Sequence, residues 1–320
     1  MGEPIFLIIG GGGYVGARLA EDLAQVGHVI VTGRRRSAIR DRWLARHLGR
    51  ITWQTYDAAT DGTLPVEGDY VAVFNLATPS AAEAAAQPDA ARHQALATVE
   101  AAVQLVATGR ARRLLHFSTF HVYGAPSETA PRPWYRESDP PTPTHPYGVM
   151  HAACEAYLSA ANLPNTIIVR PTNLIGAPAH LDLGPQQQLM FLDLCWQAVQ
   201  HRVMTLRTDG LAYRDFLPLA SALAGIHRLL SSECPPRQCH LAAGQAMPLR
   251  DLAERIRQVA AAQYGWEVTL AFGKHPDAFR HPFQVDITAL HELGWSPAGG
   301  ETLDAEIAAT LASFNAMTPS

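Results

Sequence analysis

Residues 5–23 read IFLIIGGGGYVGARLAEDL, in which an apolar run leads into four glycines and then into apolar residues at helical spacing. The pattern predicts a buried strand, a tight turn and a helix. Glycines in such a turn let a pyrophosphate approach the backbone and the positive end of the helix. Two registers of the glycine motif of dinucleotide-binding proteins fit, Gly10-x-x-Gly13-x-x-Gly16 and Gly11-x-Gly13-x-x-Gly16. A glycine-rich hairpin without a ligand is the alternative. The expected contacts are Gly10, Gly13, Tyr14, Val15 and Gly16.

The alternation of short apolar runs and alanine-rich stretches continues to residue 171. It predicts an α/β fold with a doubly wound parallel Rossmann sheet. We expect a dinucleotide-binding domain over 1–171 and a smaller, mixed α/β substrate domain over 172–320, interleaved with late Rossmann elements. Expected strands lie at 5–9, 28–32, 51–56, 70–76, 113–118 and 166–170, and expected helices at 15–26, 81–108, 147–161 and 303–315.

The segment 125–146 holds seven prolines among its 22 residues, which predicts a loop. It lies between the fifth strand and the next helix, at the edge of the sheet where ligands bind in such folds. We therefore expect this loop to face the ligand.

Bulk properties restrict the class of partner. The formal net charge is −4 and charged residues make up 17 %, so no basic excess is present to bind nucleic acid. No apolar run reaches the length of a membrane span or signal-peptide core, and we expect a cytoplasmic protein. The four cysteines lack metal-ligand spacing, so we expect reduced thiols and no metal site.

The second expected strand ends in Gly33-Arg34-Arg35-Arg36, where an NAD-binding chain normally carries an acidic residue. Guanidinium groups favour a ribose 2′-phosphate, so Arg34 and Arg35 predict NADP in preference to NAD. A solvated basic turn is the alternative. Asp57, just past the third strand, is placed to accept a hydrogen bond from the adenine amino group, or it forms a turn.

Seven separated motifs, in order along nearly the whole chain, resemble those of the extended short-chain dehydrogenase/reductase family, the nucleotide-sugar epimerases and reductases. The motif on the fourth expected strand differs from the family pattern at its first position, because Asn75 stands where the family usually has histidine. The motifs are the glycine turn at 10–16, Asn75-Leu76-Ala77, the segment 116–124 ending in Val-Tyr-Gly, Pro146-Tyr147-Gly148, the segment 170–176, Tyr213-Arg214-Asp215-Phe216 and Leu293-Gly294-Trp295-Ser296-Pro297.

The resemblance implies roles for individual residues. Leu76 and Ala77 would pass beside the coenzyme. Tyr147 would exchange a proton with the substrate oxygen while hydride moves to or from the nicotinamide, and Thr119 would hydrogen-bond the same oxygen. Asn173 and Arg214 would hold the diphosphate of a nucleotide sugar. On local grounds, a loop-capping amide at Asn173 and a surface salt bridge at Arg214 remain open.

His151 stands where the family has the lysine of Tyr-x-x-x-Lys. Histidine is less charged at neutral pH, so it should lower the tyrosine pKa less, although a ring N–H can still reach a ribose hydroxyl. Alcohol oxidation should suffer more than carbonyl reduction. The alternatives are a charge supplied by His121 or His145, and an ordinary helix residue in a protein that has lost turnover. Phe120 and His121 also replace the acidic pair of the family's dehydratases, which disfavours that reaction.

The leading prediction is an NADP(H)-dependent oxidoreductase or epimerase that acts on a sugar carbonyl or alcohol, with a nucleotide sugar as its small-molecule substrate. A third alternative keeps the same chemistry but has another ketone as the substrate, because a fold does not determine the substrate. The runner-up is a catalytically weakened NADP(H)-binding or redox-sensing module on the same fold. The alanine-rich pattern is compatible with two arrangements. Helices after the third and fourth strands could form the contact of a homodimer, and the alanine-rich stretch could equally pack on the sheet.

Overall fold

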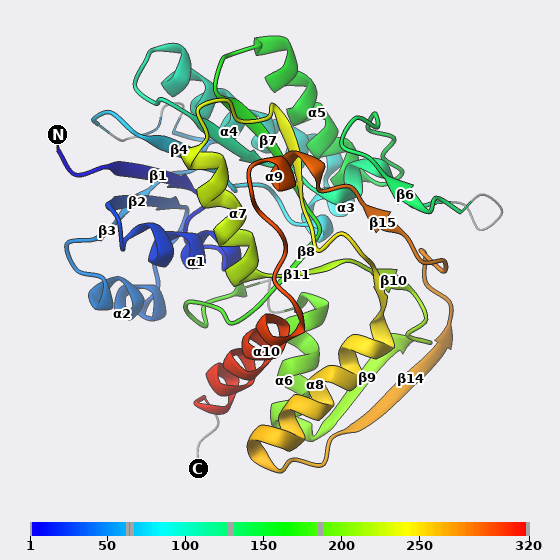
Figure 1. Cartoon of the computed structure of the whole chain (residues 1–320). Coiled ribbons are helices and arrows are strands. Elements are labelled where there is room, and N and C mark those ends of the chain that lie inside the picture. The colour runs from blue at the N-terminus through cyan, green and yellow to red at the C-terminus, as the bar shows by residue number, and fades with distance from the viewer. Residues whose placement is uncertain (1, 62–63, 65–66, 127–130, 185–187, 318–320) are drawn as a thin grey trace.

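A seven-stranded parallel sheet, in the order β12-β7-β5-β4-β1-β2-β3, forms the centre of the computed structural model, which describes residues 2–61, 64, 67–126, 131–184 and 188–317 (Figure 1). Helices cover both of its faces, so the predicted doubly wound Rossmann sheet is confirmed. The strands are β1 Ile5–Ile9, β2 His28–Gly33, β3 Ile51–Thr55, β4 Ala72–Asn75, β5 Leu114–Phe117, β7 Thr166–Pro171 and β12 Gln238–Leu241.

Alternate residues of the strands enter two separate cores, as the two-residue period of a strand requires. Phe6 and Ile8 of β1 pack with α1, α2 and α7, whereas Leu7 and Ile9 pack with α3, α4 and α5. Strands buried on both faces read as continuous apolar runs, which explains why they were recognisable in the sequence. The helices are α1 Tyr14–Leu23, α2 Ala38–Arg46, α3 Ala81–Ala86, α4 Pro88–Ala107, α5 Pro146–Ala161 and α7 Leu219–Ser231.

The single helix expected over 81–108 was wrong, because the chain forms α3 and α4 there. Gln87 leaves the helical region, with φ −142° and ψ 73°, since the ring of Pro88 disfavours the helical conformation of the residue before it. α4 turns Ala95, Val99 and Ala102 onto the sheet, so one face of the alanine-rich stretch does pack as proposed.

A smaller lobe has its own apolar core, formed between α6, α8 and α10 and the strand pair β9 and β14 (Figure 1). Late elements also return to the main sheet: β12 pairs with β7, and α7 covers the sheet. The remaining elements are η1 Phe120–Tyr123, β6 Trp134–Tyr135, β8 Asn173–Ile175, α6 Met190–His201, β9 Val203–Thr208, β10 Tyr213–Arg214, β11 Phe216–Pro218, β13 Met247–Pro248, α8 Leu249–Tyr264, β14 Thr269–His275, β15 Gln284–Val285, α9 Thr288–Glu292 and α10 Gly300–Asn315. Within the described ranges, no helix combines the length and apolar character that crossing a membrane requires.

Glu306 of α10 joins the smaller lobe to the main sheet. Its carboxylate accepts hydrogen bonds from the backbone N–H groups of Ala177, at 3.0 Å, and Ala220, at 2.9 Å. The guanidinium of Arg18 on α1 lies 3.3 Å from each carboxylate oxygen. Since Glu306 is only 5 % exposed, these partners compensate a buried charge and fix α10 against α1.

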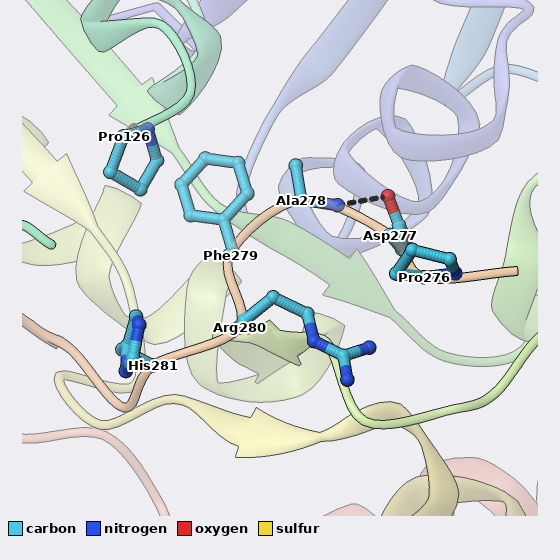
Figure 2. A pocket seen from close by; sticks show the side chains of 7 residues that line it. All are labelled: Pro126, Pro276, Asp277, Ala278, Phe279, Arg280 and His281. Atoms are coloured by element: carbon cyan, nitrogen blue, oxygen red, sulfur yellow. Dashed lines mark hydrogen bonds between the residues drawn. The ribbon is translucent and has the colours of Figure 1, made fainter. Parts of the chain in front are cut away.

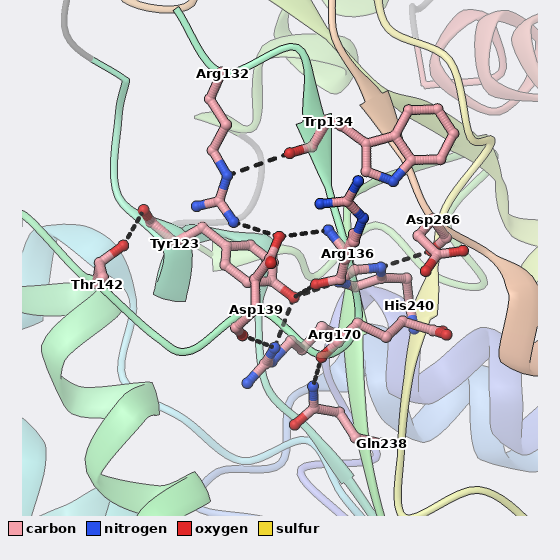
Figure 3. Close-up of polar contacts among 11 residues, drawn as sticks. Tyr123, Arg132, Trp134, Arg136, Asp139, Thr142, Arg170, Gln238, His240 and Asp286 are labelled. Atoms are coloured by element: carbon pink, nitrogen blue, oxygen red, sulfur yellow. Dashed lines mark hydrogen bonds and ion pairs between the residues drawn. The ribbon is translucent and has the colours of Figure 1, made fainter. Parts of the chain in front are cut away.

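A second buried ionic group lies between α5 and β7. Arg170 donates to both oxygens of Glu155, at 3.0 and 2.6 Å, and the two side chains are 2 % and 5 % exposed. Arg170 also donates to the hydroxyl of Tyr123 at 2.6 Å, and that hydroxyl lies 2.5 Å from Nε2 of His240 (Figure 3). The Ser118 hydroxyl donates to Glu155 at 2.5 Å. This network holds α5 on the carboxyl ends of the central strands.

Candidate active site

The glycine turn lies between β1 and α1, at the carboxyl edge of the sheet. Gly10 has φ +84°, and a Cβ there would lie 2.8 Å from the backbone nitrogen of Ala77. Gly13 is the N-cap residue of α1. The backbone N–H groups that open a helix have no partner within it and attract anions. The structure therefore brings Gly10, Gly13, Leu76 and Ala77 together around a helix start suited to a pyrophosphate.

Alanine at position 10 is expected to weaken both folding and coenzyme binding. The new Cβ would meet the backbone of Ala77 in a conformation that disfavours side chains, which costs about 1–3 kcal/mol. Urea denaturation and coenzyme titration of Gly10→Ala measure the two effects. Gly49→Ala is the matched control, since Gly49 has φ +79° and no atom within 4 Å of its Cβ position. Equal effects in both variants would mean that the approach to Ala77 does not matter.

The turn after β4 is held by two buried side chains. Oδ1 of Asn75 accepts from the N–H of Ala77 at 3.2 Å, and Nδ2 donates to the Thr98 hydroxyl at 3.3 Å. The Thr98 hydroxyl also lies 3.0 Å from the Ala77 carbonyl oxygen. Asn75 and Thr98 thus fix Ala77 against the glycine turn.

The first two helical residues point their side chains away from the turn. The Tyr14 hydroxyl donates to the carbonyl oxygen of Gly176 at 2.6 Å, and Val15 packs between the two apolar cores. The Tyr14 side chain is therefore committed to the segment after β8, and Val15 contributes to packing.

Three arginines follow β2, and they differ in their partners. Arg36 is paired with Asp41 at 2.5 Å, and Arg34 lies 3.8 Å from Glu83. Arg35 is exposed, and its guanidinium makes no hydrogen bond or ion pair with the part of the chain that the structure describes. Arg35 is thus the arginine best placed to take an external anion.

Asp57 lies in a turn past β3. Its Oδ1 accepts from the N–H of Ala59 at 3.0 Å, and its carbonyl oxygen accepts from Thr60 and Asp61. The carboxylate therefore forms the turn in this structure, with Oδ2 left for any contact to an adenine.

Trp53 of β3 is a neighbour of the glycine turn that the sequence analysis did not include. A Cβ on Gly12 would lie 2.7 Å from its ring, and a Cβ on Gly33 would lie 2.5 Å from it. Arg40 of α2 lies 5.8 Å from the ring centroid. The indole thus covers Gly12 and Gly33, and no local sequence pattern indicates this contact.

Thr119 and Tyr147 lie together at the carboxyl end of β5. Burial raises the pKa of the Tyr147 phenol to about 12, and a hydrogen bond with the Thr119 side chain opposes that rise. Thr119 caps η1 and is 6 % exposed. The phenol is therefore protonated at neutral pH and can donate a proton.

His151 lies one helical turn beyond Tyr147, and its ring meets the phenol edge to face with centroids 4.6 Å apart. It is 1 % exposed, and neither ring nitrogen has a hydrogen-bond partner among the described residues. Burial, with the nearby His116 and His121, holds the pKa of His151 well below its ordinary value. The imidazole is therefore neutral at pH 7 and supplies no positive charge beside the phenol.

Two further histidines lie against Tyr147. The ring of His145 stacks on the phenol at 6.3 Å and 10°, and its Nδ1 accepts from the N–H of Gly148 at 3.3 Å, so it caps α5. His121 lies 6.1 Å from Tyr147 and 5.2 Å from His145. Burial lowers the pKa of His145, so it does not replace the missing cation at neutral pH.

A small cavity opens beside Thr119 and brings Asn173 and Arg214 to the same place. Asn173 donates to the Asp215 carbonyl oxygen at 2.9 Å, and Arg214 is paired with Asp277 at 2.9 Å. Both side chains thus have internal partners that a ligand would have to replace or share. The lining residues are Thr119, Phe120, His121, Pro171, Thr172, Asn173, Arg214, Asp215, Phe279 and Phe283.

A second hollow adjoins this cavity, and Phe279 lines both. Figure 2 shows that Asp277, Phe279, Arg280 and His281 reach it from one continuous stretch of chain. This stretch lies more than a hundred residues from Thr119, and no motif in it resembles a known site pattern. Its contribution could be found only once the fold was known.

The sheet and its glycine turn define a Rossmann-type dinucleotide-binding protein. Residues 6–238 match the sequence model of the NAD dependent epimerase/dehydratase family, and the chain belongs to this family. It is an enzyme of the short-chain dehydrogenase/reductase type, so the resemblance found in the sequence is confirmed. A nicotinamide coenzyme is the cofactor of this class.

Named relatives cover almost the whole chain. A UDP-glucose 4-epimerase of Streptomyces lividans is 25 % identical in an alignment that covers 92 % of this chain and 91 % of that protein. The UDP-N-acetylglucosamine 4-epimerase of Methanobrevibacter ruminantium, solved with UDP-N-acetylmuramic acid, has a TM-score of 0.83 at 18 % identity and covers 99 % and 100 % of the two chains. RMD of Pseudomonas aeruginosa, complexed with NADPH, has a TM-score of 0.72 at 20 % identity, with 98 % and 100 % covered.

Proposed function

We propose that this enzyme is an NADP(H)-dependent oxidoreductase or epimerase that acts on a sugar carbonyl or alcohol carried by a nucleoside diphosphate. The proposal depends on one observation. Thr119, Asn173 and Arg214 line one cavity, and the side chains of Tyr147 and Thr119 form a hydrogen bond. The relatives named for UDP-sugars support the substrate class.

The residues at the glycine turn fit a nicotinamide coenzyme. Gly10 and Gly13 leave the backbone open at the start of α1, Ala77 closes the turn from β4, and Arg35 offers an unpaired guanidinium after β2. When bound, the coenzyme supplies or accepts the hydride. NADPH in a structural neighbour supports the NADP preference, although the family as a whole is named for NAD.

The Arg35→Glu variant is expected to bind NADPH about tenfold more weakly and NADH about as well as before, because only NADPH carries the phosphate that the guanidinium would hold. Fluorescence titration with each coenzyme measures the ratio of the two dissociation constants. Arg92→Glu is the control, since Arg92 is an exposed arginine on the outer side of α4. An unchanged ratio in Arg35→Glu would contradict the proposal and indicate that Arg34 and Arg35 belong to a solvated basic turn.

Tyr147 is the proposed acid. Its phenol is protonated at neutral pH and donates to the substrate oxygen as a carbonyl is reduced, while the Thr119 hydroxyl hydrogen-bonds the same oxygen. Alcohol oxidation requires the phenolate, which the neutral His151 does little to stabilise. Reduction is therefore the favoured direction, and an epimerase would have to pass through the less favoured one.

Nicotinamide absorbance in the presence of nucleotide-ketosugars tests the function. Oxidation of NADPH by any of them supports the reductase. The buried, uncharged His151 also favours a second candidate, a protein that binds NADP(H) without turnover. Tight NADPH binding with no absorbance change across a broad panel of nucleotide sugars would favour that candidate and overturn the first.

A further inference from the structure

The turn between β2 and α2, which carries the arginines proposed for the ribose phosphate, is held by one side chain of α2. The guanidinium of Arg40 donates to the carbonyl oxygen of Arg35 at 2.7 Å. It also donates to the carbonyl oxygen of Asp182 at 3.3 Å, and its Nε lies 3.3 Å from the carboxylate of the same residue. Arg40 thus connects the turn to a segment that lies 142 residues further along the chain.

Asp182 belongs to the segment that follows β8 and precedes α6. Its carboxylate also accepts from the Ser37 hydroxyl at 2.5 Å. That hydroxyl in turn accepts from the N–H of Arg40 at 3.2 Å, so Ser37 caps α2. The side chains of Arg40 and Asp182 are 19 % and 26 % exposed, so their ion pair is only partly screened by solvent. One carboxylate therefore holds both the start of α2 and the arginine that contacts the turn.

The two arginines of this arrangement have different tasks. The Arg40 guanidinium lies 5.8 Å from the centroid of the Trp53 ring, and its donors serve backbone carbonyl oxygens inside the protein. The Arg35 side chain is exposed and points to solvent, but its backbone is fixed through its carbonyl oxygen. A long side chain loses conformational freedom when it binds a ligand, and a fixed backbone lowers that cost. Because Arg40 matches the charge of Asp182, the pair adds no net charge near an anion held by Arg35.

We infer that Asp182 is a positioning residue for the site of the coenzyme 2′-phosphate: through Arg40 it fixes the backbone of Arg35, and so the direction in which the Arg35 guanidinium meets the phosphate. The fixed turn stands on the contacts alone, while the phosphate contact rests on the proposed function. The preference for NADPH then depends on a residue of the segment after β8, far in sequence from the turn that meets the phosphate.

Fluorescence titration with NADPH and with NADH measures the effect on specificity. Asp182→Ala and Arg40→Met are each expected to weaken NADPH binding about three- to tenfold, because a loosened Arg35 loses more conformational freedom on binding. NADH binding is expected to stay nearly unchanged, whereas a general loss of structure would weaken both coenzymes. Since the two residues act through one set of contacts, the double variant is expected to bind no more weakly than the weaker single variant. Tighter NADPH binding in Asp182→Ala would mean that Arg40 is itself a phosphate ligand, and would overturn the proposal.

Limited digestion with trypsin, without coenzyme, measures the order of the turn itself. Trypsin cuts after arginine, and residues 34–36 are three arginines in the turn. Asp182→Ala is expected to be cut there about three to ten times faster than the wild type, because cleavage follows the population of the open turn. Arg46→Met is the matched control, since Arg46 ties the last residue of α2 to the same segment through the carbonyl oxygen of Ala179, at 2.9 Å. It is expected to leave both the cleavage at 34–36 and the coenzyme ratio unchanged.

The two measurements separate this inference from the proposed function. A wild-type protein that binds NADPH no more tightly than NADH would contradict the proposed preference for NADP(H), and the digestion would still decide whether Asp182 fixes the turn. A wild-type preference for NADPH that Asp182→Ala leaves unchanged would overturn the inference alone. Changes in Arg46→Met as large as those in Asp182→Ala would do the same, because any contact between α2 and the segment would then have the effect.

Discussion

In the Tyr147→Phe variant, kcat for carbonyl reduction is expected to fall by about 10²–10⁴-fold, with the NADPH dissociation constant nearly unchanged. The substitution removes only the hydroxyl that is bonded to Thr119, and the ring contacts with His145 and His151 remain available. Stopped-flow absorbance of bound NADPH measures the transfer step separately from substrate binding.

Tyr157→Phe is the matched control, since Tyr157 lies on the same helix, ten residues beyond Tyr147, and the substitution removes the same hydroxyl group. It is expected to leave kcat unchanged. If Tyr147→Phe altered KM alone, the phenol would hold substrate without transferring a proton, and another acid would have to be sought among His121 and His145.

The pH dependence should differ between the two directions of reaction. With the pKa of Tyr147 raised to about 12 by burial, the phenol keeps its proton through the neutral range, so reduction is expected to vary little there. Oxidation needs the phenolate and is expected to rise about tenfold per pH unit up to that pKa. His151→Lys, which adds a cation, is expected to shift this rise to lower pH. An unchanged rate and profile in His151→Lys would leave His151 without a role.

Glu155→Gln is expected to have the largest effect on folding. It leaves the Arg170 guanidinium buried without its carboxylate, and breaking a buried pair in this way costs about 3–5 kcal/mol. The Ser118 hydroxyl would also lose its charged acceptor. The midpoint of urea denaturation, followed by circular dichroism, measures the loss, provided that the slope of the transition stays constant.

Glu254→Gln on α8 is the control, because Glu254 is paired with Arg257 at 2.5 Å on the exposed side of the helix. Solvent screens such a pair, so the midpoint is expected to move very little. If the two variants shifted the midpoint equally, burial of the Arg170 network would not contribute to stability in the way that its geometry indicates.

The glycine turn could be predicted from the sequence, because it depends on backbone conformation and on local order. Gly10 and Gly13 follow a strand and open a helix, and both properties are visible within twenty residues. The apolar runs also located six of the seven strands of the sheet, whereas β12 at Gln238–Leu241 was not expected. Helix boundaries are harder to predict: the alanine-rich pattern of 81–108 is continuous, but Pro88 restricts the backbone of Gln87 and divides the stretch into two helices.

Contacts made by distant segments could not be predicted in this way. Asp277 pairs with Arg214 from 63 residues away, and Phe279 and Phe283 close the cavity from the same stretch. His116 read as one residue of a strand motif, and its position beneath His151 depends on how α5 packs on β5. Such partners follow from the packing of layers, which a single sequence does not encode locally.

The carboxylate of Glu306 has a wider consequence, because it couples Arg18 of α1 to a helix 288 residues further along the chain. The charge of Arg18 on α1 is matched by that carboxylate only when α10 has docked. A chain shortened before α10 would leave Arg18 without this counter-ion and would uncover the apolar residues that α10 covers. Stable placement of α1, and with it coenzyme binding, is therefore expected to require α10.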